Sequence, residues 1–472
     1  MAARLACSLH PEPLKRYLIQ FAHDHLDFRL QEIKSIVSLL GCPAVLKDSD
    51  LKNGSPFMEL HLSNERDARA IMKRTVLSKR LYELWADGPT LTDVCQKLKQ
   101  LPREQTEPYT REDSSFCIVV DSFNKKISSA EKIKRIEYLT EYNTMFRGRI
   151  NLKSPDNAFH LLEYYHHDSK SAETPEKVYL GRWISDGQRG IVKDYHLQNR
   201  CFIANTSMDA CLSLIMANLA QVKENDLVLD PFVGSGSLLV ASAHFGAYVM
   251  GTDIDYMLLH AKGINVMVVW QRARPSRANQ KARSVEESVY NNLKQYGLET
   301  KYLDILVADA SQDMWREACK FDAIITDPPY GIREAAARIV SRQDIQVATV
   351  EGSPHYPQRC QYQLGDIFKD LLKFAAQHLS LGGRLVYWLP TYKPNYSESS
   401  IPQHPCLQLE SNCEQSLNST ISRRLITMVK VQECQNVYSE ETSTTVNNIN
   451  NFRNNYFKAL QQKSNVKQNG TL

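Results

Sequence analysis

The sequence predicts an α/β protein whose C-terminal part is a Rossmann-like, doubly wound sheet of seven mainly parallel strands. Three observations predict this fold. From Leu227 onward, short apolar strands alternate with helical segments, which is the pattern of a parallel sheet. A glycine-rich turn follows the first of these strands, and an acidic residue stands at the end of each of the first four. Ligands of such sheets bind outside the carboxyl ends of the strands, so we expect a site there.

The expected strands of this sheet are short and apolar. Five belong to the parallel part, and they are 227–232, 248–254, 303–309, 321–327 and 384–389. Two further strands, 407–409 and 424–431, follow without a long helix between them, which predicts a terminal antiparallel hairpin. The last residues, 433–472, are rich in Asn, Gln, Ser and Thr and predict a mostly disordered tail.

The N-terminal half predicts smaller α+β structure. A strand at 17–21, a helix at 28–40 and strands at 44–46 and 57–62 give a βαββ start. Apolar positions in 67–85 have roughly helical spacing, and Asp87-Gly88-Pro89 ends the run before a further helix at 91–101. Strands and basic turns then alternate, at 116–121, 146–156 and 178–183.

Length and composition limit the class of protein. With 472 residues, the chain is long enough for two or three domains. No apolar run approaches the roughly 18 residues that span a bilayer, and the N-terminus lacks a secretory signal, so we expect a cytoplasmic protein without a membrane span. Its 11 cysteines are scattered without a CxxC pair, which predicts no metal site and no disulfide framework. The net charge is only +4 (57 basic minus 53 acidic residues), so any nucleic-acid affinity must come from local patches.

The glycine-rich turn and the strand ends predict a nucleotide-like cofactor. Glycines let the backbone approach such a ligand closely, and a carboxylate after the second strand is placed to accept hydrogen bonds from both ribose hydroxyls. An acid after the third strand can accept a hydrogen bond from the amino group of adenine. Each acid alone could be a helix cap, a reading that suits Asp255 better than Asp253. The predicted cofactor-binding residues of these strands and turns are Asp230, Phe232, Gly234, Gly236, Asp253, Ile254, Asp309 and Ala310.

The fourth strand ends in the most specific signal, Asp327-Pro328-Pro329-Tyr330. The two prolines fix φ and remove two N–H donors, so the backbone carbonyls are free to accept hydrogen bonds. Asp327 and the Pro328 carbonyl can receive the two N–H groups of an exocyclic amine on a base, while the ring of Tyr330 offers a stacking surface. We therefore predict these four residues to be catalytic, in methyl transfer to that amine. The loop itself accepts guanine, adenine or cytosine.

Together these residues resemble the catalytic subunit of the THUMP-domain tRNA (guanosine-10 N2)-methyltransferases. The resemblance covers about 15–431 and includes the stretches 148–156, 178–182 and 205–210. It implies the class I methyltransferase fold, S-adenosyl-L-methionine as cofactor, and formation of N2-methylguanosine at position 10 of tRNA. In similar enzymes Thr206 and its neighbours help to close the cofactor pocket. A methyltransferase of adenine N6 or cytosine N4 in RNA or DNA is the enzymatic alternative, and an inactive RNA-binding scaffold is the other.

The resemblance also implies a domain order and two partners. We expect a ferredoxin-like domain at 1–65, a THUMP tRNA-binding domain at 66–185, a linker at 186–204 and the methyltransferase domain at 205–432. The partners are tRNA and a small zinc-binding activator subunit that forms a heterodimer with the chain. Basic residues fixed by strands and turns are the candidates for tRNA phosphate contacts, and they are Arg147, Arg149, Lys153 and Arg182. Two further segments could contact substrate. One is the run of basic residues within 271–283, and the other is the loop 331–365, with Arg333, Arg338 and Arg342.

Overall fold

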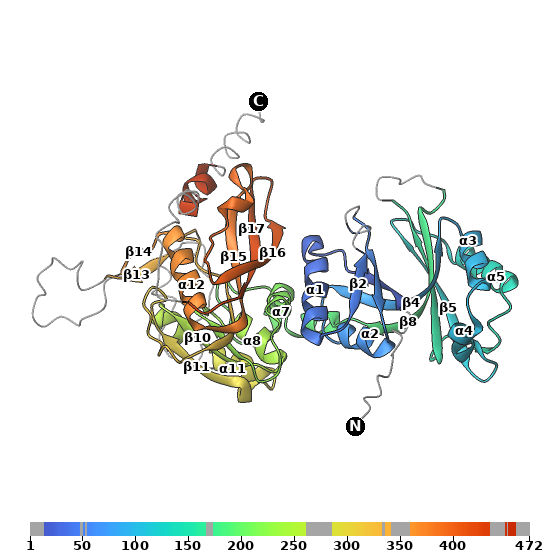
Figure 1. Cartoon of the computed structure of the whole chain (residues 1–472), viewed down its shortest axis with the longest axis horizontal. Helices are drawn as coiled ribbons and strands as arrows, with labels where there is room; N and C mark the ends of the chain where they lie inside the picture. The colour runs from blue at the N-terminus through green and yellow to red at the C-terminus, as the bar shows by residue number, and fades with distance from the viewer. Residues whose placement is uncertain are drawn as a thin grey trace, which may run out of the picture. The chain divides into compact units, whose positions relative to one another are not determined.

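The computed structural model describes residues 14–47, 51, 54–166, 173–260, 286–332, 336–340, 359–434, 449–450 and 452–458 (Figure 1). The chain divides into two compact units, and the division falls between Arg189 and Gly190. In the ranges given above, no helix combines the length and the apolar character needed to cross a membrane. Each unit is built on its own large sheet.

The N-terminal unit is built on one eight-stranded sheet with the order β2-β3-β1-β4-β8-β7-β5-β6. Its strands are β1 (Lys15–Phe21), β2 (Ala44–Lys47), β3 (Phe57–Leu62), β4 (Ser78–Gly88), β5 (Ser115–Phe123), β6 (Arg149–Ile150), β7 (Asn157–Tyr164) and β8 (Lys177–Asp186). Its helices are α1 (Arg29–Leu40), α2 (Glu65–Met72), α3 (Leu91–Lys99), α4 (Arg103–Thr110) and α5 (Ser129–Tyr142). The sheet runs continuously across the predicted boundary between residues 65 and 66, so the division of this unit into two domains stays a prediction.

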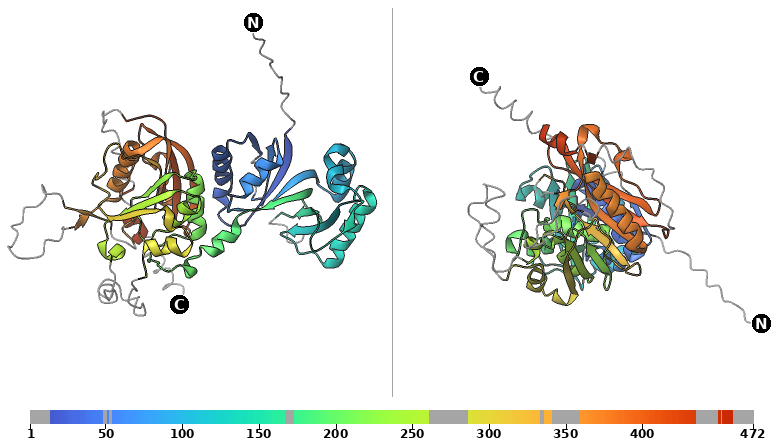
Figure 2. Two further views of the ribbon diagram at one scale, coloured as in Figure 1. Left: turned by 90° about the horizontal axis from the view of Figure 1, so that it is seen from below. Right: turned by 90° about the vertical axis from the view of Figure 1, so that its left-hand side faces the viewer.

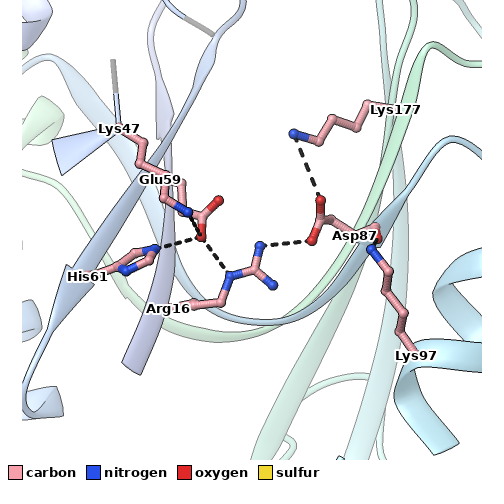
Figure 3. Close-up of polar contacts among 7 residues, drawn as sticks. All are labelled: Arg16, Lys47, Glu59, His61, Asp87, Lys97 and Lys177. Atoms are coloured by element: carbon pink, nitrogen blue, oxygen red, sulfur yellow. Dashed lines mark hydrogen bonds and ion pairs between the residues drawn. The ribbon is translucent and has the colours of Figure 1, made fainter. Parts of the chain in front are cut away.

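Charged side chains hold the middle of this sheet together. Arg16 lies on β1, between β3 and β4, and its guanidinium contacts Glu59 on one neighbour at 2.6 Å and Asp87 on the other at 2.8 Å (Figure 3). Lys47 and His61 also contact Glu59, at 3.3 and 2.7 Å. One arginine thereby links three adjacent strands of the sheet.

The expected helix over 67–85 is wrong in its second half. Helix α2 ends at Met72, and β4 begins at Ser78. The burial pattern of β4 is a nearly continuous buried run because the strand is covered on both faces. Such a strand lacks the alternation of apolar and polar residues that marks a half-buried strand, so its apolar positions resembled a helix.

The C-terminal unit has the predicted seven-stranded sheet, with the order β11-β10-β9-β12-β15-β17-β16. Its strands are β9 (Leu227–Asp230), β10 (Tyr248–Asp253), β11 (Tyr302–Val307), β12 (Phe321–Thr326), β15 (Leu379–Tyr392), β16 (Leu407–Ser416) and β17 (Ile421–Lys430). The first five are parallel to one another, and β17 is antiparallel to both of its neighbours, which confirms the terminal hairpin. Helices α7 (Ala210–Leu219) and α8 (Ser237–His244) lie on one face and α12 (Leu364–His378) on the other (Figure 2).

Two predicted boundaries of this unit need correction. The expected linker 186–204 contains helix α6 (Arg189–Asp194), and its last residues pack into the C-terminal unit. Arg200 is buried and donates to the Ser237 hydroxyl at 2.7 Å, and the Phe202 N–H donates to Asn292 at 2.8 Å. The tail predicted to be disordered contains helical residues at 449–450 and 452–458, whose buried apolar side chains the overall composition concealed.

Candidate active site

The glycine-rich turn follows β9 at the carboxyl edge of the sheet. Gly234 and Gly236 both have positive φ, 51° and 77°, and Gly236 forms the N-cap of α8 in the left-handed conformation. A Cβ atom on Gly236 would lie 2.5 Å from Cγ1 of Val289. The turn therefore requires glycine at 236 both for its backbone conformation and for the close approach of a neighbouring side chain.

Asp253 at the end of β10 supports this turn. Its carboxylate accepts the N–H of Gly234 at 3.0 Å and the N–H of Asp255 at 2.9 Å. Burial raises the pKa of Asp253. Asp255, by contrast, accepts the N–H groups of Met257 and Leu258 at 3.0 and 3.2 Å, in the capping role that the sequence indicated. The two acids thus have separate positions, and Asp253 is the one held against the glycine turn.

Asp230 is only 2% exposed and connects the glycine turn to β12, which lies beside β9 in the sheet. One of its oxygens accepts the N–H of Phe232 at 3.0 Å and the hydroxyl of Thr326 at 2.7 Å. Burial, together with the charges of Asp253 and Asp327, raises the pKa of Asp230 to about 7. Three carboxylates therefore share a partly desolvated edge of the sheet, an environment that favours a cationic ligand.

Asp309 lies after β11 and is 6% exposed. Its carboxylate accepts the N–H of Ser311 at 2.9 Å and the N–H of Ile339 at 2.6 Å. Ile339 belongs to a short hairpin of β13 (Ala337–Ile339) and β14 (Arg359–Gln361), and Arg359 of this hairpin donates to the Ile254 carbonyl at 2.7 Å. The described part of loop 331–365 therefore packs on the predicted cofactor residues. Of the loop's three predicted arginines, Arg338 lies in β13, and Arg333 and Arg342 lie outside the described residues.

A cavity beside this edge combines apolar walls with one acid. Its lining includes three predicted cofactor residues, Phe232, Asp309 and Ala310, together with Trp315 and Phe374. Aromatic and aliphatic walls with a single buried carboxylate suit a planar heterocycle that carries an amino group. The positions chosen from the sequence at three separate strand ends thus meet around a shared edge.

The segment before α7 reaches both the turn and the fourth strand. Thr206 is exposed, while the hydroxyls of Ser207 and Ser235 lie 2.6 Å apart, which ties the segment to the glycine turn. The Met208 sulfur accepts from the Arg423 guanidinium at 3.6 Å. Among the described atoms, the side-chain nitrogen of Asn205 is buried without a hydrogen-bond partner. An unpaired buried donor at this position fits a site that a polar ligand completes.

Asp327 lies at the end of β12 with two polar side chains directed at it. The hydroxyl of Tyr330 donates to one carboxylate oxygen, and Arg423 Nη1 lies 3.3 Å from the other. The guanidinium of Arg423 is stacked over the ring of Trp388, 4.0 Å from its centroid. Burial raises the pKa of Asp327, although the positive charge of Arg423 opposes the shift. The stacking role predicted for Tyr330 stays a prediction, since here its hydroxyl is engaged with the carboxylate.

Comparison with known proteins identifies the family. Residues 15–189 match the model described as the Tmrp11 THUMP N-terminal domain, and residues 198–343 match the RMKL-like methyltransferase domain. The mouse protein named tRNA (guanine(10)-N(2))-methyltransferase TRMT11 is 49% identical over 461 residues, which cover 96% of this chain and 97% of the mouse protein. The chain belongs to the TRMT11 family of tRNA (guanine(10)-N(2))-methyltransferases.

Other TRMT11 relatives also align over most of their length. The human protein is 47% identical over 97% of both chains, and the Dictyostelium discoideum protein is 33% identical over 89% of this chain and 83% of its own. Among solved structures, TrmN from Thermus thermophilus aligns with 88% of this chain and 100% of its own, at 16% identity and a TM-score of 0.39. A possible methylase from Clostridium difficile aligns at 14% identity and a TM-score of 0.41, over 90% of this chain and 100% of its own.

Arg423 is a site residue that the sequence did not reveal in this TRMT11-family chain. It lies 96 positions beyond Asp327, on β17, and no motif surrounds it. The antiparallel register that pairs Arg423 with Pro390 brings it to the carboxyl end of β15, next to β12. A signal could have come from the terminal hairpin itself, because a basic residue near the start of its last strand must return to the catalytic edge.

The candidates for phosphate contacts separate into two groups. Arg147, Arg149 and Lys153 are exposed, as a phosphate contact requires. Arg182 is 5% exposed and pairs with the buried Glu83 and the partly exposed Glu65, so its assignment to phosphate binding is wrong. A buried guanidinium with two carboxylate partners is already neutralised and cannot reach a phosphate in solvent. The basic run Arg272, Arg274, Arg277, Lys281 and Arg283 lies outside the described residues.

The structure also gathers three metal-ligating side chains that sequence spacing did not reveal. His404, Cys406 and Cys434 bring one potential ligand atom each within 4.8 Å of the others, and the two sulfurs are 2.8 Å apart. The two cysteines are 28 positions apart, so no short motif marks them. They flank the β16–β17 hairpin at the edge of the sheet opposite the carboxyl ends of the parallel strands.

Proposed function

We propose that the chain is the catalytic subunit of an enzyme that transfers a methyl group from S-adenosyl-L-methionine to N2 of guanosine 10 in tRNA. The position of Asp327 carries this proposal: its carboxylate lies at the carboxyl edge of the sheet, beside the acids of the glycine turn. Membership of the TRMT11 family, whose named members act on guanine 10 of tRNA, supports the choice of base. The four residues from Asp327 to Tyr330 are the proposed catalytic loop.

The residues of the edge fit S-adenosyl-L-methionine. Asp253 would accept hydrogen bonds from the ribose hydroxyls. Asp309 would hold the adenine together with Phe232 and Ala310, which line the cavity. Gly234, Gly236, Ile254 and Thr206 would surround the remainder of the ligand. When bound, the cofactor supplies an electrophilic methyl group on a positively charged sulfonium. The raised pKa values of Asp230, Asp253 and Asp327 indicate unfavourable carboxylate charge, which a cationic ligand would offset.

In the proposed mechanism, Asp327 and the Pro328 carbonyl accept the two N–H groups of the guanine amine. This orientation aims the nitrogen lone pair away from the protein backbone and toward the methyl donor. The Asp327 carboxylate also stabilises the positive charge that develops on nitrogen, and the proton leaves afterwards to solvent or to this carboxylate. Arg423 is a positioning residue, because its ion pair with Asp327 and its stacking on Trp388 fix the carboxylate without touching the substrate.

Nucleoside analysis tests this function. The purified chain, together with its activator, is incubated with unmodified tRNA and S-adenosylmethionine, and the nucleosides are identified by mass spectrometry. We expect N2-methylguanosine. If the product is N6-methyladenosine or N4-methylcytidine, the proposed base is wrong but the proposed catalytic loop stands. If cofactor binding is normal and no nucleoside is methylated, the chain is an RNA-binding scaffold.

The N-terminal unit is the proposed tRNA-binding part. Arg147, Arg149 and Lys153 are exposed in a stretch whose backbone is fixed, because a Cβ on Gly148 would lie 1.9 Å from the Ser114 carbonyl oxygen and the Asn151 side chain accepts the Lys153 N–H at 3.1 Å. Fixed cations lose little conformational freedom when they contact phosphates. Each contact would also steepen the dependence of tRNA affinity on salt.

The small zinc-binding activator is the proposed protein partner, and β11 is its proposed docking strand. β11 is an edge strand of the sheet, and Leu303 and Val307 on it are 48% and 43% exposed. An apolar edge strand can accept another strand through its free backbone groups. We expect Leu303→Asp to prevent co-purification of the activator, whereas Leu409→Asp on the opposite edge strand β16 leaves it intact. Equal retention by both variants would exclude β11.

The cytoplasm is the proposed compartment. Scattered cysteines without paired spacing are typical of a reducing environment. Fractionation of cells that express the tagged full chain tests this placement, and recovery of the chain with secreted or organelle-lumen proteins would contradict it.

A further inference from the structure

The helical tail segment, residues 449–450 and 452–458, returns to the C-terminal unit. Ile449 and Phe452 are 6% and 4% exposed and belong to the apolar cluster that contains α12 and the end of β15. Asn450 accepts the N–H of Gly365 at 2.7 Å and donates to the Gln363 side chain at 3.0 Å. Figures 1 and 2 show the segment, in red, beside the ends of the orange strands. Apolar and polar contacts both anchor it at the start of α12.

The tail segment also lies next to the proposed catalytic loop. A Cβ atom on Gly331, the residue after Tyr330, would lie 3.9 Å from Cδ of Arg453. Tyr330 and Ile332 pack against the same apolar cluster as Ile449 and Phe452. Because Thr326 pairs with Tyr387 in parallel register, the end of β15 from Leu389 onward runs alongside the loop. Three segments that are far apart in the sequence therefore meet at this edge.

A cavity of about 320 Å³ lies between the end of β15 and the tail segment. Its lining combines aromatic and aliphatic side chains with amides and an ammonium group. The residues that matter here are Leu389, Tyr392, Asn395, Asn454, Asn455 and Lys458. Apolar surface next to amides and a lysine suits the base and the phosphate of a nucleotide, since rings stack on the base, amides form hydrogen bonds with its edge, and the ammonium contacts the phosphate.

We propose that this cavity binds a nucleotide of the substrate RNA that flanks the target guanosine, and that the tail segment is thereby part of the substrate-binding surface. This inference rests on the proposed function and deepens it. A base that reacts outside a helical stack leaves neighbouring nucleotides that the enzyme must hold. The tail segment, which lines the cavity, also lies next to the loop that would hold the reacting amine. Asn454 and Asn455 contact the base edge, and Lys458 contacts the phosphate.

Steady-state kinetics of the full chain with its activator tests this inference. Asn455→Ala with Lys458→Ala is expected to raise KM for unmodified tRNA about tenfold while KM for S-adenosylmethionine stays within twofold. The matched control is Lys369→Ala, an exposed lysine of α12 that does not line the cavity. Lys458→Arg should restore tRNA binding because it keeps the charge. An unchanged KM for tRNA, or an equal rise of both KM values, would overturn the inference.

Binding measurements separate this inference from the proposed function. In the Asp327→Ala background, where no methylation is needed, Lys458→Ala should weaken tRNA binding and reduce the salt slope of its affinity by about one counterion. If the wild-type enzyme methylates guanosine but these variants bind tRNA normally, only the cavity assignment is wrong. If wild type methylates no guanosine but the variants weaken tRNA binding, the cavity remains an RNA site and the proposed function is wrong.

Discussion

Buried charge is handled differently in the two units. In the N-terminal unit, Arg182 contacts the buried Glu83 at 2.9 Å and also pairs with Glu65, and its guanidinium lies 3.7 Å from the centroid of the Tyr109 ring. Burial disfavours the Glu59 carboxylate, but its partners Arg16, His61 and Lys47 outweigh this effect and lower its pKa to about 2 (Figure 3). In this unit the chain supplies the counter-charges itself.

At the carboxyl edge of the C-terminal sheet, the acids keep an unfavourable charge. Burial raises the pKa of Asp230, Asp253 and Asp327, and among these three Asp327 has Arg423 as an ion-pair partner. Ionising these carboxylates therefore works against folding, and carboxylates with such raised pKa values are typical of functional sites. Buried carboxylates thus have nearby cations in the N-terminal unit, whereas burial leaves the carboxylate form disfavoured at the carboxyl edge of the C-terminal sheet.

The largest expected effect concerns Asp327. Asp327→Ala should lower the rate of methyl transfer at least about 100-fold, because it removes the acceptor that orients the amine and stabilises its growing charge. The affinity for tRNA should change less than twofold, since most of the binding surface lies elsewhere. Single-turnover kinetics and filter binding measure the two effects, with Asp366→Ala on α12 as the control. Parallel loss of rate and tRNA affinity would contradict the separation of chemistry from binding.

Arg182→Met should instead damage stability. It removes the main cation beside the buried Glu83 and one of the two cations beside the partly exposed Glu65, which keeps Arg69. Breaking this buried pair should cost about 3 kcal/mol of unfolding free energy. The exposed Arg149 is the matched control, and Arg149→Ala should change stability by less than about 0.5 kcal/mol while weakening tRNA binding. Urea denaturation and tRNA titration compare the two. If Arg182→Met keeps its stability and loses tRNA affinity, the charge at this position is functional after all.

Asp253→Ala should weaken the binding of S-adenosylmethionine by roughly 1 to 3 kcal/mol, through loss of charge-assisted hydrogen bonds. Asp255→Ala provides the comparison, because this neighbouring acid caps the short helix α9 (Tyr256–His260) and its loss is expected to leave cofactor affinity nearly intact. Isothermal calorimetry gives both values. Equal affinities for wild type and Asp253→Ala would remove this residue from the cofactor site.

The smallest expected effect is a difference between Asp230 and Glu59 in how their contributions to folding stability depend on pH. The raised pKa of Asp230 means that the ligand-free fold binds an extra proton near neutral pH, so its contribution to stability is present at low pH and lost as pH rises through about 7. The lowered pKa of Glu59 acts in the opposite sense, since its contribution is present above the unfolded value of 4.5 and lost as pH falls toward about 2.

Cofactor binding should report the Asp230 titration directly. A cation favours the ionised carboxylate, so affinity for S-adenosylmethionine should rise about threefold to tenfold between pH 6 and pH 7.5. S-adenosylhomocysteine, which lacks the sulfonium charge, is the control and should change less. Asp230→Asn should flatten the difference between the two ligands. Identical pH profiles for both ligands in wild type would show that the charge of this cluster does not serve the sulfonium.

Local sequence patterns predicted much of this molecule. The five parallel strands, the glycine turn and the acids after the strands depend on residues close together in the chain. The structure has the predicted seven-stranded, mainly parallel sheet with its terminal hairpin. The errors arose where burial on both faces removed the periodic signal, as in β4, and where composition was averaged over a long segment, as in the tail. Ile449 and Phe452 were too few to alter the composition of 433–472.

The sequence by itself determined which residues stand at the ends of the strands, because strand length and turn chemistry are local properties. Only the tertiary structure decided which charges would be paired. Arg182 reaches Glu83 across 99 positions of the chain, and Arg423 reaches Asp327 across 96. Strand order and register set these distances, and a basic residue becomes a structural counter-ion or a positioning residue according to the carboxylate that the register places beside it.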